Sequence, residues 1–355
     1  MKQPGRRVFR TNLKGPKDDG GLWRRTGQIF LESTRESGRR SGNTTMTELG
    51  ALLKEARETS WQRHGKEITL YIPGMICFEG DYGRYPALSI TGPDCALRCK
   101  HCSGKLLEPM IKTSTPEELF ERCLKLDKRS IGVLITGGCL PDGRLPWSGF
   151  IPTIERIKEK TDLHISIHTG IIDQKIAQDL VGGGVDQFLI DVIGDNQTLK
   201  EIYNVDFGIE RIENSLEALA IAGAKIIPHI VVGLHYGQIR GEYEAIEMVK
   251  RYKIKTLVFV SFMPLPGTEL SNCQPPEPEE IGRLIATARL KIPDATISLG
   301  CARERGNHRI DLFALDAGVN RIAIPSDEVI ERAKTYGLKI FWQKTCCSVP
   351  ISRGR

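Results

Sequence analysis

Three cysteines lie close together at Cys95, Cys99 and Cys102, with the spacing C-x₃-C-x₂-C. Three thiolates on one short loop can hold three irons of a cubane iron–sulfur cluster, which leaves the fourth iron free to accept an external ligand. The alternative is zinc, which needs four closed ligands and commonly takes a second cysteine pair. Because no second close pair follows at a suitable distance, the spacing favours the iron–sulfur cluster.

The chain has 355 residues and ten cysteines. A chain of this length can bury a core without disulfides, so the cysteines predict metal binding or thiol chemistry in a reducing cytoplasm. The net charge is +6, of which residues 1–45 carry +7 (eleven Lys/Arg against four Asp/Glu). The folded body is therefore not expected to bind nucleic acid. No apolar run approaches the roughly 18 residues that a membrane span needs.

Strand-like and helix-like segments alternate through most of the chain. Apolar, β-branched runs predict eight strands: Ala87–Thr91, Ile131–Thr136, Leu163–His168, Gln187–Val192, Ile226–Gly233, Thr256–Phe262, Thr296–Leu299 and Arg321–Ile324. Helical patterns lie between them: Pro116–Asp127, Ile151–Lys160, Gln174–Val181, Ile209–Ala222, Glu242–Tyr252, Glu279–Leu290 and Arg309–Ala317. Near-continuous apolar strands are typical of a parallel sheet covered on both faces.

The predicted fold class is α/β, a closed (β/α)₈ TIM-like barrel, with an open doubly wound sheet as the alternative. We expect a disordered basic extension at 1–45, an N-terminal helix and strand segment at 46–84, the barrel at 85–325, and a C-terminal helix with a cysteine-bearing tail at 326–355. The three-cysteine loop follows the first barrel strand, after a Gly92-Pro93 turn. It thus lies at the end of the barrel where such enzymes keep their active sites.

A C-x₃-C-x₂-C loop after the first barrel strand resembles the radical S-adenosylmethionine (SAM) superfamily. The resemblance implies a [4Fe–4S] cluster on the three cysteines, and SAM bound to the open iron and cleaved to methionine and a 5′-deoxyadenosyl radical. It also implies residues that bind SAM: His101, which stands where the family usually has an aromatic residue, Gly137-Gly138 at the second strand's end, and Asp191 and Asp195 at the fourth strand's end. The turn at Met263–Thr268 resembles a Pro-Gly-Thr turn of the family.

From Val185 onward the chain is similar to the biotin-synthase-like branch, notably over Leu299–Glu304 and Phe313–Asn320. Members of this kind insert sulfur from a second, sacrificial cluster into unactivated C–H bonds. His229 and Ser298 stand near the positions where biotin synthase has auxiliary-cluster ligands, so the chain is not expected to be biotin synthase itself. The resemblance points instead to one component of a two-protein, archaeal-type lipoyl synthase that acts on a protein-bound octanoyl chain.

Seven cysteines lie outside the motif, and Cys123 lies on an apolar helix face as ordinary core. The expected ligand set for an auxiliary cluster is Cys139, Cys301, Cys346 and Cys347; free thiols are the alternative. His164 and His168 alternate on one strand and are expected to face the same way, with His229 beside them.

The expected partners are a reducing electron donor, a paralogous radical SAM protein and an octanoyl-carrying protein, with no nucleic acid and no membrane. The rival functions are a biotin-synthase-like reaction without sulfur insertion and a non-enzymatic metal-binding protein.

Overall fold

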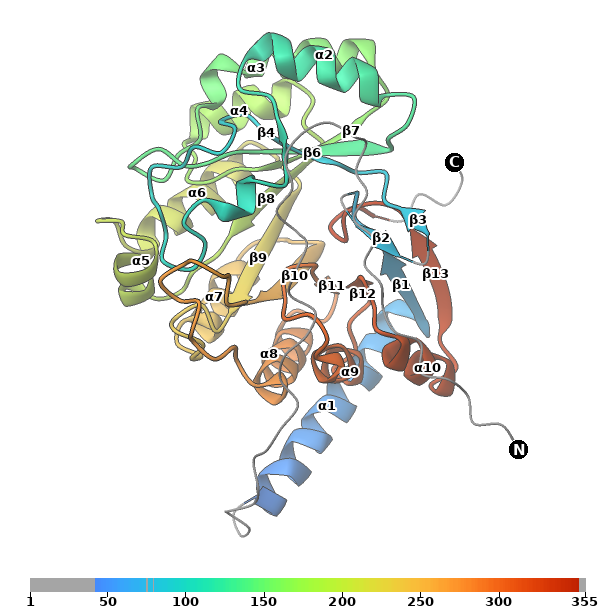
Figure 1. Cartoon of the computed structure of the whole chain (residues 1–355). Coiled ribbons are helices and arrows are strands. Elements are labelled where there is room, and N and C mark those ends of the chain that lie inside the picture. Colours follow the sequence, from blue (N-terminus) through green and yellow to red (C-terminus); the bar gives the residue numbers. More distant parts are fainter. Residues whose placement is uncertain (1–41, 75, 79, 351–355) are drawn as a thin grey trace.

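The computed structural model describes residues 42–350, apart from 75 and 79. Its centre is one curled sheet with the strand order β13-β1-β12-β11-β10-β9-β8-β7-β6-β4-β5, in which neighbouring strands pair in parallel (Figure 1). The strands are β1 (Glu67–Tyr71), β4 (Ala87–Ser89), β5 (Ile111–Lys112), β6 (Gly132–Thr136), β7 (His164–His168), β8 (Gln187–Asp191), β9 (Ile226–Val232), β10 (Thr256–Ser261), β11 (Thr296–Leu299), β12 (Arg321–Ala323) and β13 (Lys339–Gln343). Strands β2 (Cys77–Phe78) and β3 (Asp81–Tyr82) form a separate antiparallel hairpin.

Helices connect the strands and cover the outside of the curl (Figure 1). They are α1 (Gly42–His64), α2 (Pro116–Leu126), α3 (Ile151–Lys160), α4 (Gln174–Gly182), α5 (Asn196–Ile202), α6 (Ile209–Ile221), α7 (Glu242–Lys250), α8 (Pro278–Lys291), α9 (His308–Asp316) and α10 (Asp327–Thr335). Their starts are encoded locally. At α2, Thr115 accepts from the amide of Glu118, whose carboxylate bonds back to the Thr115 amide, and Pro116 occupies the first turn.

Successive side chains along each strand alternate between two hydrophobic cores, one on each face of the sheet. Ile165 and Ile167 on β7 are fully buried in the larger core between sheet and helices. A smaller core fills the inside of the curl and is built by inward-facing residues of five strands together with one cysteine: Tyr71, Leu189, Ile227, Val258, Ala323 and Cys347. Because side chains alternate across a strand, the residues between the outward-facing ones point to this interior, where the functional groups gather.

All eight predicted strands are confirmed. The prediction that they close into a ring is wrong, because the sheet is open. Strands β1 and β13 continue the sheet past β12, because β1 pairs with both β12 and β13. Within the described residues no ladder joins β13 to β5, so the sheet is an open, curled barrel. The short helix α5 was not predicted. The expected disorder at 1–45 falls almost wholly outside the described residues, and α1 begins at Gly42. No helix in the described part of the chain is long and apolar enough to cross a membrane.

Candidate active site at the carboxyl ends of the strands

The three-cysteine loop leaves the carboxyl end of β4 and turns tightly twice. The Ser103 amide donates to the Cys99 carbonyl at 2.7 Å, and the Cys102 amide donates to the same oxygen at 3.1 Å. Arg98 and Ser103 adopt positive φ angles of 44° and 49°. These left-handed residues reverse the backbone on either side of Cys99, which brings Cys99 and Cys102 to the same side of the loop.

The thiols of Cys99 and Cys102 and a ring nitrogen of His101 all lie within 4.8 Å of one another. A hydrogen bond from the Cys99 thiol, together with His101 and the Gly104 amide, lowers the pKa of Cys102. The pKa of Cys99 is raised in turn, because its thiol holds the shared proton and is buried. A thiolate is the form that ligates metal, so the loop is electrostatically prepared to do so.

Cys95 lies outside this tight group but next to it. A Cβ on Gly104 would stand 3.9 Å from the Cys95 Cβ. The three cysteines therefore lie on one loop, with the Cys99 and Cys102 thiols within 4.8 Å of each other and Cys95 outside that group.

His101 has a feature that fits a bound group. Its Nδ1 is buried without a hydrogen-bond partner among the described residues. Its ring lies 5.4 Å from that of Tyr203, with the planes inclined at 55°. Tyr203 also accepts a weak bond from the Cys99 thiol through its carbonyl, at 3.8 Å. A buried nitrogen without a partner, close to the thiols of Cys99 and Cys102, fits a cluster and cofactor that would complete the site.

Gly138 joins the end of β6 to the cysteine loop. Its amide donates to the Thr91 hydroxyl at 2.7 Å. A Cβ at this position would come within 1.9 Å of the Asp94 carbonyl and 2.6 Å of the Cys95 Cα. Gly137 is roomier, since its nearest neighbour would be 3.1 Å away. Gly138 is therefore required by close backbone approach to the loop that carries the cysteines.

Asp191 ends β8 and faces the interior with two histidines. Its Oδ1 lies 3.6 Å from Nε2 of His168, whose ring is 5.4 Å from that of His229. Burial, and then the neighbouring His168, lower the pKa of His229 to about 4, so this imidazole is neutral at physiological pH. The expected inward grouping of His168 and His229 is confirmed. His164 lies at the other end of β7, where its Nδ1 is 2.8 Å from the Tyr85 hydroxyl.

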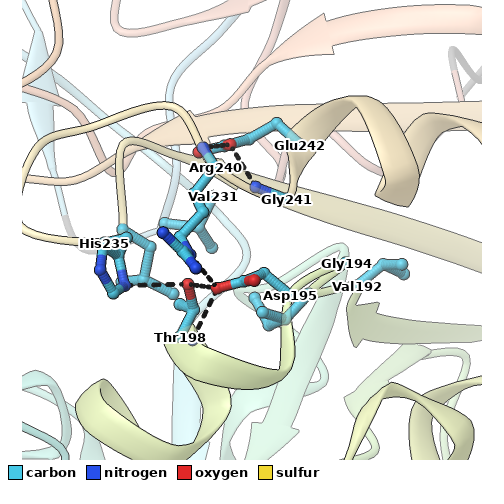
Figure 2. A pocket seen from close by; sticks show the side chains of 11 residues that line it. Val192, Gly194, Asp195, Thr198, Val231, His235, Arg240, Gly241 and Glu242 are labelled. Carbon is cyan, nitrogen blue, oxygen red and sulfur yellow. Dashed lines mark hydrogen bonds and ion pairs between the residues drawn. The ribbon is translucent and has the colours of Figure 1, made fainter.

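Asp195 caps helix α5, as Figure 2 shows. Its Oδ2 accepts from the amide and hydroxyl of Thr198 at 2.7 and 2.6 Å and from Nε of Arg240 at 2.8 Å. These bonds lower the pKa of Asp195 although burial opposes its ionisation. Both predicted aspartates lie at the carboxyl end of β8. The Asp195 carboxylate is already occupied by the cap, and Asp191 is the freer of the two.

Glu242 is a functional candidate that the sequence analysis missed. Its buried carboxylate accepts from the amides of Gly233 and Arg240, each at 2.7 Å, and of Gly241 at 3.1 Å. It thereby fixes the loop between β9 and α7 that forms one wall of the small cavity in Figure 2. The signal available in the sequence was an acid directly after a glycine, at the start of a helical pattern.

The expected auxiliary ligands fall into two groups. Cys139 lies with the motif loop, where its carbonyl accepts from the Ala96 amide at 2.8 Å. Cys301, Cys346 and Cys347 instead pack around the smaller interior core.

The predicted turn at Met263–Thr268 is closed by a hydrogen bond that the Thr268 hydroxyl donates to the Leu265 carbonyl at 2.8 Å.

Comparison with known proteins matches the chain to two family models. Residues 89–239 match the radical SAM superfamily, and residues 259–339 match the Biotin and Thiamin Synthesis associated domain. The chain belongs to the radical SAM superfamily, in its biotin-synthase-like branch. The resemblance in the sequence is thus confirmed for the family, and the comparisons do not single out a lipoyl synthase component.

Curated relatives of this radical SAM protein are named biotin synthase. That of Leptospira interrogans (strain Fiocruz L1-130) is 23% identical over 225 residues, covering 63% of this chain and 62% of the relative's own length. That of Pelotomaculum thermopropionicum is 24% identical over 296 residues, covering 83% and 88%.

Two solved structures share the fold. Methylornithine synthase (PylB) matches with a TM-score of 0.59 at 17% identity, covering 83% of this chain and 89% of that one. The hydrogenase maturase HydG from Carboxydothermus hydrogenoformans has the same TM-score and identity, with coverage of 82% and 72%. At this identity the likeness concerns the fold alone.

Proposed function

We propose that this chain is a radical SAM enzyme whose [4Fe–4S] cluster is held by Cys95, Cys99 and Cys102. When bound, the cluster would supply an electron that cleaves SAM to methionine and a 5′-deoxyadenosyl radical. The observation that carries the proposal is the cysteine loop itself. It has a prepared thiolate, a buried Nδ1 without a partner on His101, and a place at the carboxyl end of a barrel strand.

The chain's own residues would bind and orient the cofactor. Gly137 and Gly138 bring backbone to the cysteine loop, where the SAM amino group would bind. Asp191 is half-exposed at the end of β8 and has oxygen atoms free for ribose hydroxyls. Asp195 would act through its cap, by holding the first turn of α5 beside the cavity. His101 and Tyr203 would pack on the cofactor and exclude water.

For the substrate we propose sulfur insertion at an unactivated C–H bond of a protein-bound octanoyl chain. The relatives named biotin synthase support the branch. The cysteines outside the motif support a second cluster as the sulfur source, with Cys139, Cys301, Cys346 and Cys347 as its expected ligands. An electron donor, a paralogous radical SAM protein and the octanoyl carrier would be its partners.

The test uses the full chain, reconstituted with iron and sulfide without oxygen. Wild type is compared with Cys95→Ala/Cys99→Ala/Cys102→Ala, and with Cys123→Ala as a control buried thiol on α2. We expect wild type and the control to convert SAM to 5′-deoxyadenosine under a low-potential reductant, and the triple variant to form none. Unchanged cleavage in the triple variant would overturn the proposal.

Iron content then addresses sulfur insertion. About eight irons in wild type and about four in the triple variant, one cubane fewer, support a second cluster and make octanoyl carriers the first substrates to assay. About four irons and none, respectively, leave a single-cluster enzyme of cofactor biosynthesis, and sulfur insertion is rejected. Bound zinc without SAM cleavage would indicate a non-enzymatic metal-binding protein.

A further inference from the structure

The residues that follow β13 fold into the barrel instead of leaving it. Thr345, Cys347, Ser348 and Val349 are each at most 4% exposed. We call residues Thr345–Val349 the C-terminal strap. A turn inside it closes with a bond from the Val349 amide to the Cys346 carbonyl at 3.0 Å. A polar segment buried this deeply needs partners for its backbone, and the barrel provides them.

Four side chains from four different strands donate hydrogen bonds to three consecutive strap carbonyls. The Cys347 carbonyl accepts from the Ser298 hydroxyl at 3.2 Å and from Nη1 of Arg321 at 3.1 Å. The Ser348 carbonyl accepts from Nη1 of Arg321 at 3.3 Å and from Nε2 of Gln187 at 3.1 Å. The Val349 carbonyl accepts from the Tyr71 hydroxyl at 2.9 Å. Donors from β1, β8, β11 and β12 thus converge from around the curl on one segment of five residues.

The strap carbonyls pair four donors that are buried in the folded chain. Tyr71, Gln187, Ser298 and Arg321 are all at most 7% exposed. Arg321 is the most demanding, because no carboxylate in the described part of the chain lies within 4 Å of its guanidinium nitrogens. Leaving a buried cation without partners is strongly destabilising. The socket and the strap are therefore complementary parts, and Arg321 contributes the only charge among the four donors.

The strap also supplies thiols that the barrel strands lack. No strand of the eleven-stranded sheet contains a cysteine. Cys347 is part of the interior core, and Cys346 packs against it together with Cys301 from the loop after β11. That core includes Leu189, which pairs with His168 across β7 and β8, so the strap thiols face the same interior as the His168–Asp191 pair. The strap thus places its two thiols inside the curl, near the polar groups of the proposed active site.

We propose that Arg321 is a positioning residue that docks the C-terminal strap in the barrel and so fixes the thiols of Cys346 and Cys347 in the interior, facing the reaction. The placement of the thiols follows from the socket alone. Their use in the reaction rests on the proposed function. A planar guanidinium that bridges two adjacent carbonyls suits this task better than lysine, whose ammonium is a single point charge.

The direct test is alkylation of the full apoprotein with iodoacetamide at pH 8, with the rate at each cysteine measured by peptide mass spectrometry. In wild type we expect the buried Cys347 to react at least tenfold more slowly than the half-exposed Cys77. Arg321→Gln is expected to raise the rate at Cys347 at least tenfold, to raise the rate at the half-exposed Cys346 by less, and to leave Cys123 on α2 protected. Arg321→Lys is expected to fall between the two.

Arg289→Gln is the matched control. Arg289 is also a fully buried arginine that donates to backbone carbonyls, those of Pro293, Ala295 and Gly318, but it lies on α8 outside the curl. It is expected to leave the strap rates at the wild-type value. Equal strap rates in wild type and Arg321→Gln, or an equal rise in Arg289→Gln, would overturn the proposal.

If Arg321→Gln exposes Cys123 as well, the variant is globally unfolded, and Gln187→Ala/Ser298→Ala decides instead. A rise of at least threefold confined to Cys346 and Cys347 supports the socket, and wild-type rates contradict it. In reconstituted protein, Arg321→Gln is expected to keep SAM cleavage within twofold of wild type while losing product or iron beyond the motif cluster. Absence of SAM cleavage in wild type would reject the proposed function and leave the alkylation result standing.

Discussion

Two of the loops that carry cysteines, the motif loop and the C-terminal strap, are held in place in opposite ways. The motif loop keeps Cys99 and Cys102 together through its own backbone turns, with amides donating to the Cys99 carbonyl. The C-terminal strap has one such turn and otherwise depends on side chains from four distant strands. A locally determined loop leaves a spacing in the sequence that can be recognised. A loop that is fixed by tertiary contacts leaves no such spacing. Cys346 and Cys347 therefore look in the sequence like two unconnected cysteines near the end of the chain.

The same difference predicts how each region fails. Damage to the motif loop should abolish chemistry while the fold persists, because the loop lies at the rim of the barrel. Damage to the strap should cost stability and interior order, because its partners belong to the core. The four predictions below test this contrast, from the largest expected effect to the smallest.

Gly138→Ala should reduce SAM cleavage by about 100-fold or more, since displacing a catalytic loop by about 1 Å can cost that much. A Cβ at Gly138 would overlap the Asp94 carbonyl and the Cys95 backbone. Gly149→Ala is the matched control, because nothing lies within 4 Å of a Cβ there. The measurement is 5′-deoxyadenosine formed per minute, with the melting temperature as a check on folding. Activity of Gly138→Ala equal to that of the control would contradict the close approach.

Asp311→Ala should destabilise the fold by about 3–5 kcal/mol, as expected when one partner of a buried ion pair is removed. Arg303 donates to Asp311 at 2.7 Å, with both side chains at most 5% exposed, and it also binds the Gly300 and Ala323 carbonyls. This pair anchors the loop that carries Cys301.

Asp294→Ala is the control, because its partner Arg63 is exposed, and an exposed pair contributes about 1 kcal/mol or less. Urea unfolding of both variants gives the comparison. Similar midpoints would mean that the Arg303–Asp311 pair does not anchor the loop.

Much of the fold could be predicted because the strands and helices follow from local patterns of apolar and turn residues in the sequence. The runs that form β7, β8 and β10 are apolar and bounded by turns, and their ends lie within a residue or two of the predicted ones. The three-cysteine loop and Gly138 could be named as site candidates because spacing and position along the chain are local properties. Closure of the barrel was predicted wrongly, because eight strands fit a ring in number and nothing in the sequence tells that β1 and β13 pair beyond β12.

The rest of the site could not be predicted because it depends on distant contacts. Arg321 and Gln187 look like ordinary strand residues until the strap is seen between them. Asp195 was predicted as a ribose ligand from its place after a strand, and only the structure shows its carboxylate capping α5 and pairing with Arg240. The separation of Cys139 from Cys301 and Cys346 likewise depends on which end of the barrel each loop reaches.

His229, which packs against His168 inside the curl, should make stability depend on pH. Its pKa is about 4 in the folded protein against 6.5 when unfolded. Below pH 6.5 the unfolded chain therefore binds a proton that the folded chain does not, and stability falls as the pH is lowered toward 4. This group alone should cost about 2 kcal/mol between pH 7.5 and pH 5.

Urea unfolding at pH 7.5 and pH 5 measures the loss in wild type and in His229→Gln, which lacks the titrating group. Histidines that do not contact His229 titrate equally in both proteins, so the difference between the two losses reports His229 together with its neighbour His168. Equal losses would mean that the interior admits a charged imidazole at this position.

The smallest expected effect is the difference in unfolding free energy between removing a buried hydroxyl that is hydrogen-bonded and removing one that is not. Ser298 on β11 is fully buried and donates to the strap at the Cys347 carbonyl, whereas the Ser261 hydroxyl on β10 is buried with no partner among the described residues. Ser298→Ala should cost about 1 kcal/mol, the usual net value of one internal hydrogen bond. Ser261→Ala should be neutral or slightly stabilising, because it removes a buried polar group that has no partner. Matched urea curves decide between the two. A cost for Ser261→Ala as large as that for Ser298→Ala would show that packing, and not the strap, sets the stability of the barrel interior.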